Sequence, residues 1–171
     1  MARRIVSITT LTPTAYADTT SMTSATYPFI AQGASATQQS KIHEISISGQ
    51  AASSSSPTFM ILSRDSSISS SGGASNGTGQ TDAAMDTATV ALASAVVTGN
   101  TNATGPARSS TLHLMNCSVN AFGGVYFWRA NKWDECLDIV GATASLGEVS
   151  LSAFTGGTPG AIGAHMIYET L

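Results

Sequence analysis

Three histidines are the first residues to consider for chemistry, because imidazole serves as a general base and as a metal ligand near neutral pH. His43, His113 and His165 each fall in a different predicted strand, and none has a second histidine two or four residues away. The chain therefore encodes no local metal site. We expect ordinary strand histidines and assign no catalytic, metal-binding or cofactor-binding residue. A hydrolase would require one of these histidines within hydrogen-bond reach of a carboxylate and beside a pocket.

The acidic residues gather in one place, at Asp134, Glu135 and Asp138, beside Arg129 and Lys132. Paired carboxylates can perform acid–base catalysis or bind calcium. This cluster lacks the alternating oxygen ligands of a calcium loop, and the neighbouring cations offer ordinary ion pairs. We interpret it as an ion-paired surface.

The two cysteines, Cys117 and Cys136, are too distant in sequence for a CxxC motif and too few for a disulfide framework. Two buried thiols that behave as small hydrophobic residues are the favoured interpretation, and a disulfide between them is the alternative. No GxSxG elbow is present, and no phosphate-binding glycine loop follows a predicted strand. The sequence thus predicts that the protein is not an enzyme and needs no cofactor.

The composition of the chain argues against nucleic acid and membranes as binding partners. Of the 171 residues 10% are charged, the formal net charge is −3, and 42% are hydrophobic. Such a chain lacks the basic surface that binds nucleic acid and the polybasic segments that bind membranes. No run approaches the ~20 apolar residues of a membrane span. Residues 5–16 are interrupted by serine, threonine and proline, so they form no export signal, and we expect synthesis in the cytoplasm.

The elements that position the candidate functional residues are predicted to be β-strands. From residue 40 onward, alternating or β-branched runs predict strands at 41–49, 58–64, 111–117, 125–130, 136–140, 148–154 and 162–169. Residues 82–97 fit a short helical turn near 82–86 followed by a strand at 90–97, and serine- and glycine-rich loops separate these elements. About eight strands without amphipathic helices predict an all-β protein, an eight-stranded antiparallel jelly-roll-like sandwich over about residues 40–171. An immunoglobulin-like sandwich is the alternative.

The region before residue 40 differs from this body. Residues 1–39 are rich in threonine, alanine and serine and show no sustained period, apart from a possible strand at 3–9. We expect an extended N-terminal arm that becomes ordered on another surface, with one or two edge strands as the alternative. Its isolated apolar residues are the predicted partner-binding residues of the arm: Tyr16, Tyr27, Phe29 and Ile30.

The segment from Asn120 to Val140 holds both tryptophans and the densest charge. Val125 to Ala130 is apolar on both predicted faces, so we expect a strand near the middle of a sheet. A polar turn at Ala130–Asp134 and a return strand at 136–140 predict a hairpin. Trp133, in that turn, is a further partner-binding candidate, either as an interface anchor or as a platform that stacks on sugar.

Three segments carry a resemblance to a known group of proteins. Lys41-Ile-His-Glu-Ile-Ser-Ile-Ser-Gly49, Asn120-Ala-Phe-Gly-Gly-Val-Tyr-Phe-Trp128 and Gly160-Ala-Ile-Gly-Ala-His-Met-Ile-Tyr-Glu169 resemble small virion proteins of tailed bacteriophages, similar to jelly-roll capsid decoration (cement) proteins. The resemblance spans about residues 40–171, and its motifs are strand patterns.

The resemblance implies a non-enzymatic protein on the outside of a phage head, where it stabilises contacts between major capsid subunits. It also implies a homotrimer or homodimer whose partner is the major capsid protein. Low charge and the absence of a recognisable reactive site agree with this expectation. The alternative function is a receptor- or glycan-binding module of a tail or fibre that uses Trp133.

Overall fold

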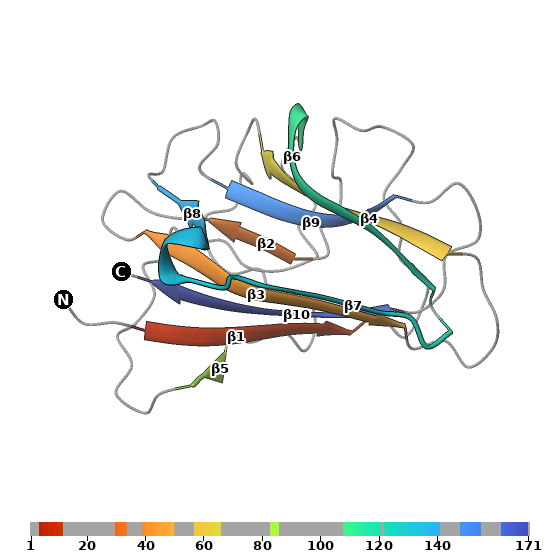
Figure 1. Cartoon of the computed structure of the whole chain (residues 1–171), viewed down its shortest axis with the longest axis horizontal. Coiled ribbons are helices and arrows are strands. Elements are labelled where there is room, and N and C mark those ends of the chain that lie inside the picture. The colour runs from red at the N-terminus through yellow and green to blue at the C-terminus, as the bar shows by residue number, and fades with distance from the viewer. Residues whose placement is uncertain are drawn as a thin grey trace.

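The structure is a computed structural model of the chain. It describes residues 4–11, 30–33, 39–49, 57–65, 83–85, 108–120, 122–140, 148–154 and 162–170. These segments form two antiparallel β-sheets that face each other (Figure 1). The all-β prediction is confirmed at this level, and within the described residues the helical structure is limited to one short 3-10 segment, η1 (Trp133–Glu135).

The first sheet has six strands. Five lie side by side across the sheet, and the sixth pairs with one of these five. Their order is β5 (Ala83–Ala84), β1 (Arg4–Leu11), β10 (Ile162–Thr170), β3 (Ser40–Gly49) and β7 (Val125–Arg129), and β8 (Leu137–Ile139) also pairs with β3. The second sheet has four strands, in the order β2 (Ile30–Gly33), β9 (Glu148–Phe154), β4 (Pro57–Asp65) and β6 (Arg108–Asn120).

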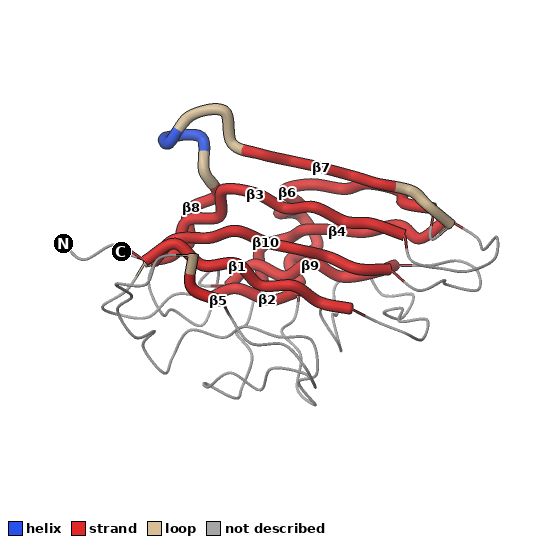
Figure 2. The backbone as a smooth tube through the Cα atoms, turned by 90° about the horizontal axis from the view of Figure 1, so that it is seen from below, coloured by secondary structure: helices blue, strands red, loops and turns tan. Residues whose placement is uncertain are grey.

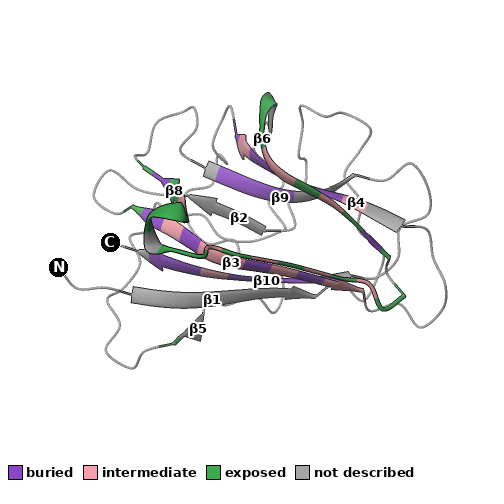
Figure 3. Ribbon diagram, in the orientation of Figure 1, coloured by how far each residue is buried: buried purple, intermediate pink, exposed green. Residues whose placement is uncertain are grey.

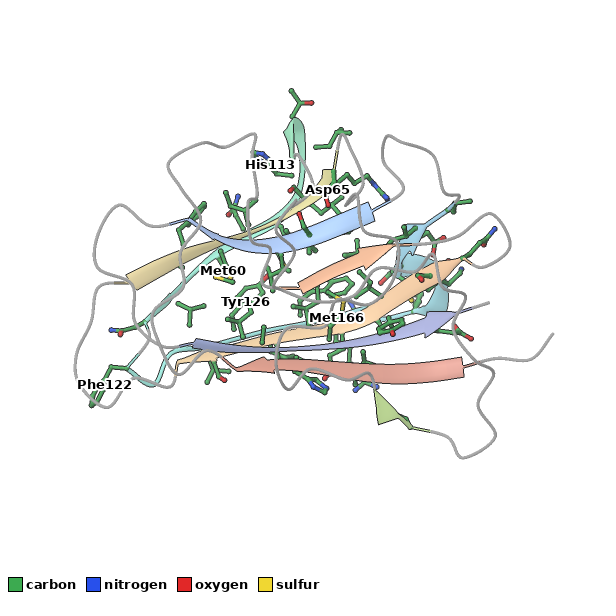
Figure 4. All side chains as sticks on the ribbon, turned by 180° about the vertical axis from the view of Figure 1, so that it is seen from behind. Met60, Asp65, His113, Phe122, Tyr126 and Met166 are labelled. Carbon is green, nitrogen blue, oxygen red and sulfur yellow. The ribbon has the colours of Figure 1, made fainter. Side chains whose placement is uncertain are left out.

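The core lies between the sheets and follows the period-two pattern of the strands. Ile45 and Ile47 of β3 are buried, and the serines between and after them lie on the opposite face. Met166 of β10 and Met60 of β4 belong to the same cluster. Figure 4 shows Met60, Tyr126 and Met166 between the two sheets, whereas Phe122 points away at one end of the molecule.

Sequence periodicity located the long strands well. The predicted strands at 41–49, 58–64, 148–154 and 162–169 correspond to β3, β4, β9 and β10. The strand predicted at 111–117 is longer than expected, because β6 extends from Arg108 to Asn120. The helical turn predicted near 82–86 is wrong at Ala83 and Ala84, which are extended and pair with β1. The strand predicted at 90–97 lies outside the described residues.

The predicted N-terminal arm contains two strands of these sheets. β1 pairs with β10 from Arg4↔Thr170 to Leu11↔Gly163, and β2 pairs with β9 from Ile30↔Leu151 to Gly33↔Glu148. β2 is an edge strand, as in the alternative, whereas β1 lies between β5 and β10 and is not at an edge. The division of the chain at residue 39 stays a prediction, and the described residues contain no helix of the length and apolarity needed to cross a membrane.

Candidate functional site

The side chains of β7 alternate between the core and the outer face of the sheet. Tyr126 and Trp128 point inward and pack against the core, whereas Val125 and Phe127 point outward and are 76% and 56% exposed (Figure 3). Phe122, in the preceding turn, is 57% exposed. We call Phe122, Val125 and Phe127 the β7 apolar surface.

The position of β7 corrects the expectation of a central strand. In the described sheet β7 pairs with β3 on one side and forms the edge of the sheet, as Figure 2 shows. A strand that is apolar on both faces looks the same in sequence whether its second face is covered or exposed. An edge strand also offers backbone N–H and C=O groups that can pair with another chain.

The turn before β7 sets its starting point. The amide of Gly124 donates to the carbonyl of Asn120 (2.8 Å), and the side-chain Oδ1 of Asn120 accepts from the amide of Phe122 (2.9 Å). Gly123 has φ of +80°, which favours glycine. The amide of Gly49 donates to the carbonyl of Gly124 (2.7 Å), which connects this turn to the end of β3.

The segment after β7 is not the predicted hairpin. β8 pairs with β3, with Leu137 opposite Ile42, and β7 pairs with β3 two residues further along, with Arg129 opposite Glu44. Both strands thus continue along the same side of β3, and residues 130–136 between them arch out of the sheet opposite His43. Figure 2 shows this arch, with η1 in blue, projecting beyond the sheet. The hairpin prediction failed because the pairing partner lies far away in sequence.

The pairing of β3 with β10, on the side opposite the arch, is also irregular at His43. Ile167 of β10 is opposite Glu44 and Tyr168 is opposite Ile42, so β3 has one extra residue at His43, a β-bulge. The carbonyl of His43 accepts a hydrogen bond from the amide of Ala130 (2.9 Å), the first residue of the arch. A bulge on one side and an arch on the other aim the imidazole into the space between β10 and the arch.

The imidazole of His43 joins a thiol to a carboxylate. The Sγ of Cys136, the last residue of the arch, lies 3.0 Å from Nδ1 of His43. On the other side of the ring, Nε2 of His43 lies 3.4 Å from Oε2 of Glu169 in β10. Glu169 is fully buried, whereas His43 and Cys136 are half-buried. We call Cys136, His43 and Glu169 the thiol–imidazole–carboxylate site.

Its electrostatics favour the protonated thiol at rest. Burial raises the pKa of Cys136 above its ordinary value; Lys41 lowers this pKa, and the carboxylates of Asp138, Glu169 and Asp134 raise it further. With Nε2–H of His43 donating to the Glu169 carboxylate, Nδ1 is the acceptor for the Cys136 S–H. In that tautomer of His43, the site holds a protonated thiol beside a base.

A pocket of about 380 Å³ adjoins the site. The pocket is lined by β3, the end of β7, β10, the arch and the residue after β5: His43, Glu44, Met85, Ile167 and residues 129–132. His43 is the member of the site that lines it. The volume falls within the range of small-molecule sites. The condition stated for a hydrolase, a histidine near a carboxylate and beside a pocket, is met by His43 among the described residues.

The acidic cluster matches its interpretation as an ion-paired surface. Asp138 pairs with Lys41 across β8 and β3 (3.4 Å), and Glu135 pairs with Lys132 within the arch (3.9 Å). In the part of the chain that the structure describes, His, Cys, Asp and Glu residues form no group of three suited to a metal ion.

Both cysteines are free thiols, and both are half-buried rather than fully buried. Cys117 lies in β6 of the second sheet, and Cys136 lies beside β8 of the first. Burial raises the pKa of Cys117 from 9.0 to about 11. The alternative of a disulfide between them is not found in the structure.

The predicted partner-binding residues fall in different places. Trp133 begins η1, at the projecting arch, and Ile30 begins β2, whereas Tyr16, Tyr27 and Phe29 lie outside the described residues. His113 lies exposed on β6, and His165 faces away from the core on β10. Neither takes part in the thiol–imidazole–carboxylate site.

The sequence contained one signal for the site that was missed. His43 and Glu44 place two polar residues between Ile42 and Ile45, which interrupts the alternation of β3 and is typical of a bulge. The convergence of Cys136 and Glu169 on His43 depends on pairings between distant segments, which periodicity does not reveal.

Comparison with known proteins was made at the level of family models, curated sequences and solved structures. The chain matches no family model, no curated protein and no solved structure.

Proposed function

We propose that this chain is a capsid decoration (cement) protein of a tailed bacteriophage, which binds the outside of the head and stabilises contacts between major capsid subunits. The observation that carries the proposal is the β7 apolar surface, at the edge of the first sheet as formed by the described residues. Apolar side chains that gather at an edge strand mark a surface for another protein, because they gain free energy when a partner excludes water from them.

The resembling segments support this assignment by where they lie. Lys41–Gly49, Asn120–Trp128 and Gly160–Glu169 each include all but one residue of β3, β7 and β10, which are adjacent in the first sheet. The similarity to decoration proteins thus covers one continuous half of a sheet, and that half ends at the β7 apolar surface.

We further propose that the body is a jelly roll. If β7 and β8 count as one interrupted strand and the two-residue β5 is set aside, the first strand pairs with the last, the second with the last but one, and so on inward. The pairs are β1 with β10, β2 with β9, β3 with β7 and β8, and β4 with β6. This nested pairing is the pattern of a long hairpin rolled into two sheets, as in jelly rolls.

In this proposal β1 and β2 belong to the body, and the partner-binding stretch before residue 40 is the connection between them, which carries Tyr16, Tyr27 and Phe29. Trp133, on the arch beside the sheet edge, is the proposed anchor on the capsid, and Ile30 stays a candidate. The protein acts as a homotrimer or homodimer, located on the exterior of virions and made in the host cytoplasm, without nucleic acid, membrane or cofactor.

Head binding tests the proposal. Purified wild-type protein and the variant Val125→Lys/Phe127→Lys are mixed with heads assembled from the major capsid protein of the same phage and sedimented together. We expect the variant to bind at least ~10-fold more weakly, because two desolvated apolar side chains become charged. The matched control is Leu112→Lys, at a 41% exposed position of β6 in the other sheet. Full-strength attachment of the β7 variant would show that this surface does not dock.

A glycan array separates the proposal from a receptor-binding role. The alternative predicts that wild-type protein binds a sugar and that Trp133→Ala abolishes the signal, since an aromatic ring provides the stacking surface. We expect no glycan signal from either protein. Sugar binding that depends on Trp133, together with no attachment to heads, would favour the tail or fibre function.

A further inference from the structure

The thiol–imidazole–carboxylate site has the arrangement of an activated nucleophile. A sulfur 3.0 Å from a ring nitrogen is within the reach at which a base removes a proton, and the same ring is oriented by a carboxylate on its far side. The 3.4 Å separation between His43 and Glu169 is long for a hydrogen bond, as catalytic contacts often are before a substrate binds. Docking on a capsid does not require this arrangement.

We propose that Cys136 accepts acyl groups from small esters and thioesters, with His43 as its general base and Glu169 as the positioning residue of that base. This inference goes beyond the decoration role and does not depend on it. It also differs from the sequence-based expectation of a chain without reaction chemistry.

The acyl transfer proceeds in two coupled proton movements. As Sγ of Cys136 attacks the acyl carbon, its proton passes to Nδ1 of His43, and a carbon–sulfur bond forms. When the tetrahedral intermediate collapses, the bond from the acyl carbon to the leaving oxygen or sulfur breaks, and the leaving group takes the proton back from Nδ1. The products are a thioester on Cys136 and a free alcohol or thiol, so no oxidant or other co-reactant is needed.

The resting thiol explains why His43 is necessary. Because burial and nearby carboxylates raise the pKa of Cys136, little thiolate exists in the free protein at neutral pH. A base in contact must therefore remove the proton during the attack. The contact with Glu169 orients the ring so that Nδ1 faces the sulfur. In the tautomer with the proton on Nε2, toward Glu169, Nδ1 is free of a proton and can accept the one from Cys136.

The pocket reaches the site through His43, and we infer the class of acyl donor from its size and lining. Its volume of about 380 Å³ suits a small molecule and not a folded polypeptide, and Met85, Ala130 and Ile167 give it an apolar part. Asn131 and Lys132 in the same wall carry N–H groups that can donate to the oxyanion of the intermediate. Esters and thioesters have good leaving groups, so they need less oxyanion stabilisation than amides.

The test uses the full chain and p-nitrophenyl acetate as the acyl donor, near neutral pH. Release of p-nitrophenolate is followed with time, and peptide mass mapping locates the acetyl group. We expect one acetyl group on Cys136, formed ~100-fold faster in wild type than in His43→Ala, which is the usual contribution of a general base. Added imidazole should restore part of the acetylation of Cys136 in His43→Ala, which a purely structural role of His43 would not give. This is scored on the Cys136 peptide and not by p-nitrophenolate release, because free imidazole itself cleaves p-nitrophenyl acetate.

Cys117 is the internal control, since it is also a free, half-buried cysteine, and its pKa is about 11. Cys136→Ser should abolish the initial release of p-nitrophenolate, and Cys117→Ser should leave it unchanged. Glu169→Gln, with its fold verified by circular dichroism, should alter the pH dependence of acetylation, because the charge next to the ring is removed. A packing role alone would leave that profile in place.

Two results would overturn the proposal. One is acetylation of Cys136 at the rate found for Cys117, and the other is an unchanged rate in folded His43→Ala. Head binding is measured separately, so failure of acylation would not affect the decoration proposal, and failure of docking would not affect this one.

Discussion

Burial in the fold lowers the reactivity of one cysteine, Cys117. Cys117 of β6 faces partly inward, and burial raises its pKa from 9.0 to about 11. The folded protein therefore holds this thiol in its neutral form well above neutral pH. The sign of the effect on stability follows: stability from this group is complete below pH 9, where both states are protonated, and is lost as pH rises from 9 towards 11.

The raised pKa predicts slow alkylation of Cys117. At pH 8 the thiolate fraction of a group with a pKa of about 11 is about 100-fold lower than that of an ordinary cysteine, and only the thiolate reacts. Iodoacetamide labelling of Cys136→Ser, which leaves Cys117 as the single thiol, should be about 100-fold slower folded than in urea. Equal rates in the two conditions would contradict the burial of this sulfur.

A buried hydrogen bond between sheet strands gives a second prediction for a single residue. The hydroxyl of Ser150 in β9 donates to Oδ1 of Asp65 in β4 (2.7 Å), and both residues are fully buried. Ser150→Ala removes a donor from a buried carboxylate, so we expect the free energy of unfolding to fall by about 1–3 kcal/mol. Urea denaturation measures this change. Ser118→Ala, at an exposed position of β6, should change it by less than about 0.5 kcal/mol.

The connection from β6 to β7 depends on two glycines for different reasons. A Cβ on Gly124 would lie 2.5 Å from the backbone oxygen of Asn120, whereas a Cβ on Gly123 meets no atom within 4 Å. Gly123 instead needs glycine for its positive φ. The turn thus combines one steric requirement with one conformational requirement.

The two substitutions should therefore differ in magnitude. We expect Gly123→Ala to lower the free energy of unfolding by about 1 kcal/mol, the penalty for a left-handed residue with a side chain. Gly124→Ala should lower it by about 3 kcal/mol, because backbone atoms have to move and the hydrogen bond to Asn120 is disturbed. Thermal denaturation in parallel tests the order, and the reverse order would refute this account of the turn.

Strands whose own alternation of apolar and polar residues defines their faces could be predicted from sequence. Strands identified only by pairing with a distant segment could not. The isoleucines and serines of β3 define its inner and outer faces without further information. β8 has three residues, and its pairing with β3 rather than β7 depends on the arch between them. The thiol–imidazole–carboxylate site inherits this difficulty, since it joins β3, the arch and β10.

Over the whole molecule, the position of β1 decides between an arm and a structural strand. β1 lies between β5 and β10 in the first sheet and pairs with β10 along eight residues. Deleting residues 2–11 should therefore lower the melting temperature by at least about 10 °C or prevent folding, because an inner strand is removed. A detachable arm would leave the melting temperature unchanged. Phe127→Ser, on the exposed edge, is the matched variant that should barely alter it.

The pairing of β1 with β10 also affects the order of folding events. Arg4 lies opposite Thr170, so the start of β1 and the end of β10 are neighbours in the first sheet. During synthesis β1 (Arg4–Leu11) leaves the ribosome long before its neighbour β10 (Ile162–Thr170) exists. Since pairing between distant segments slows folding, completion of the first sheet should be a late folding event, and the newly made protein should stay sensitive to protease until β10 has paired with β1.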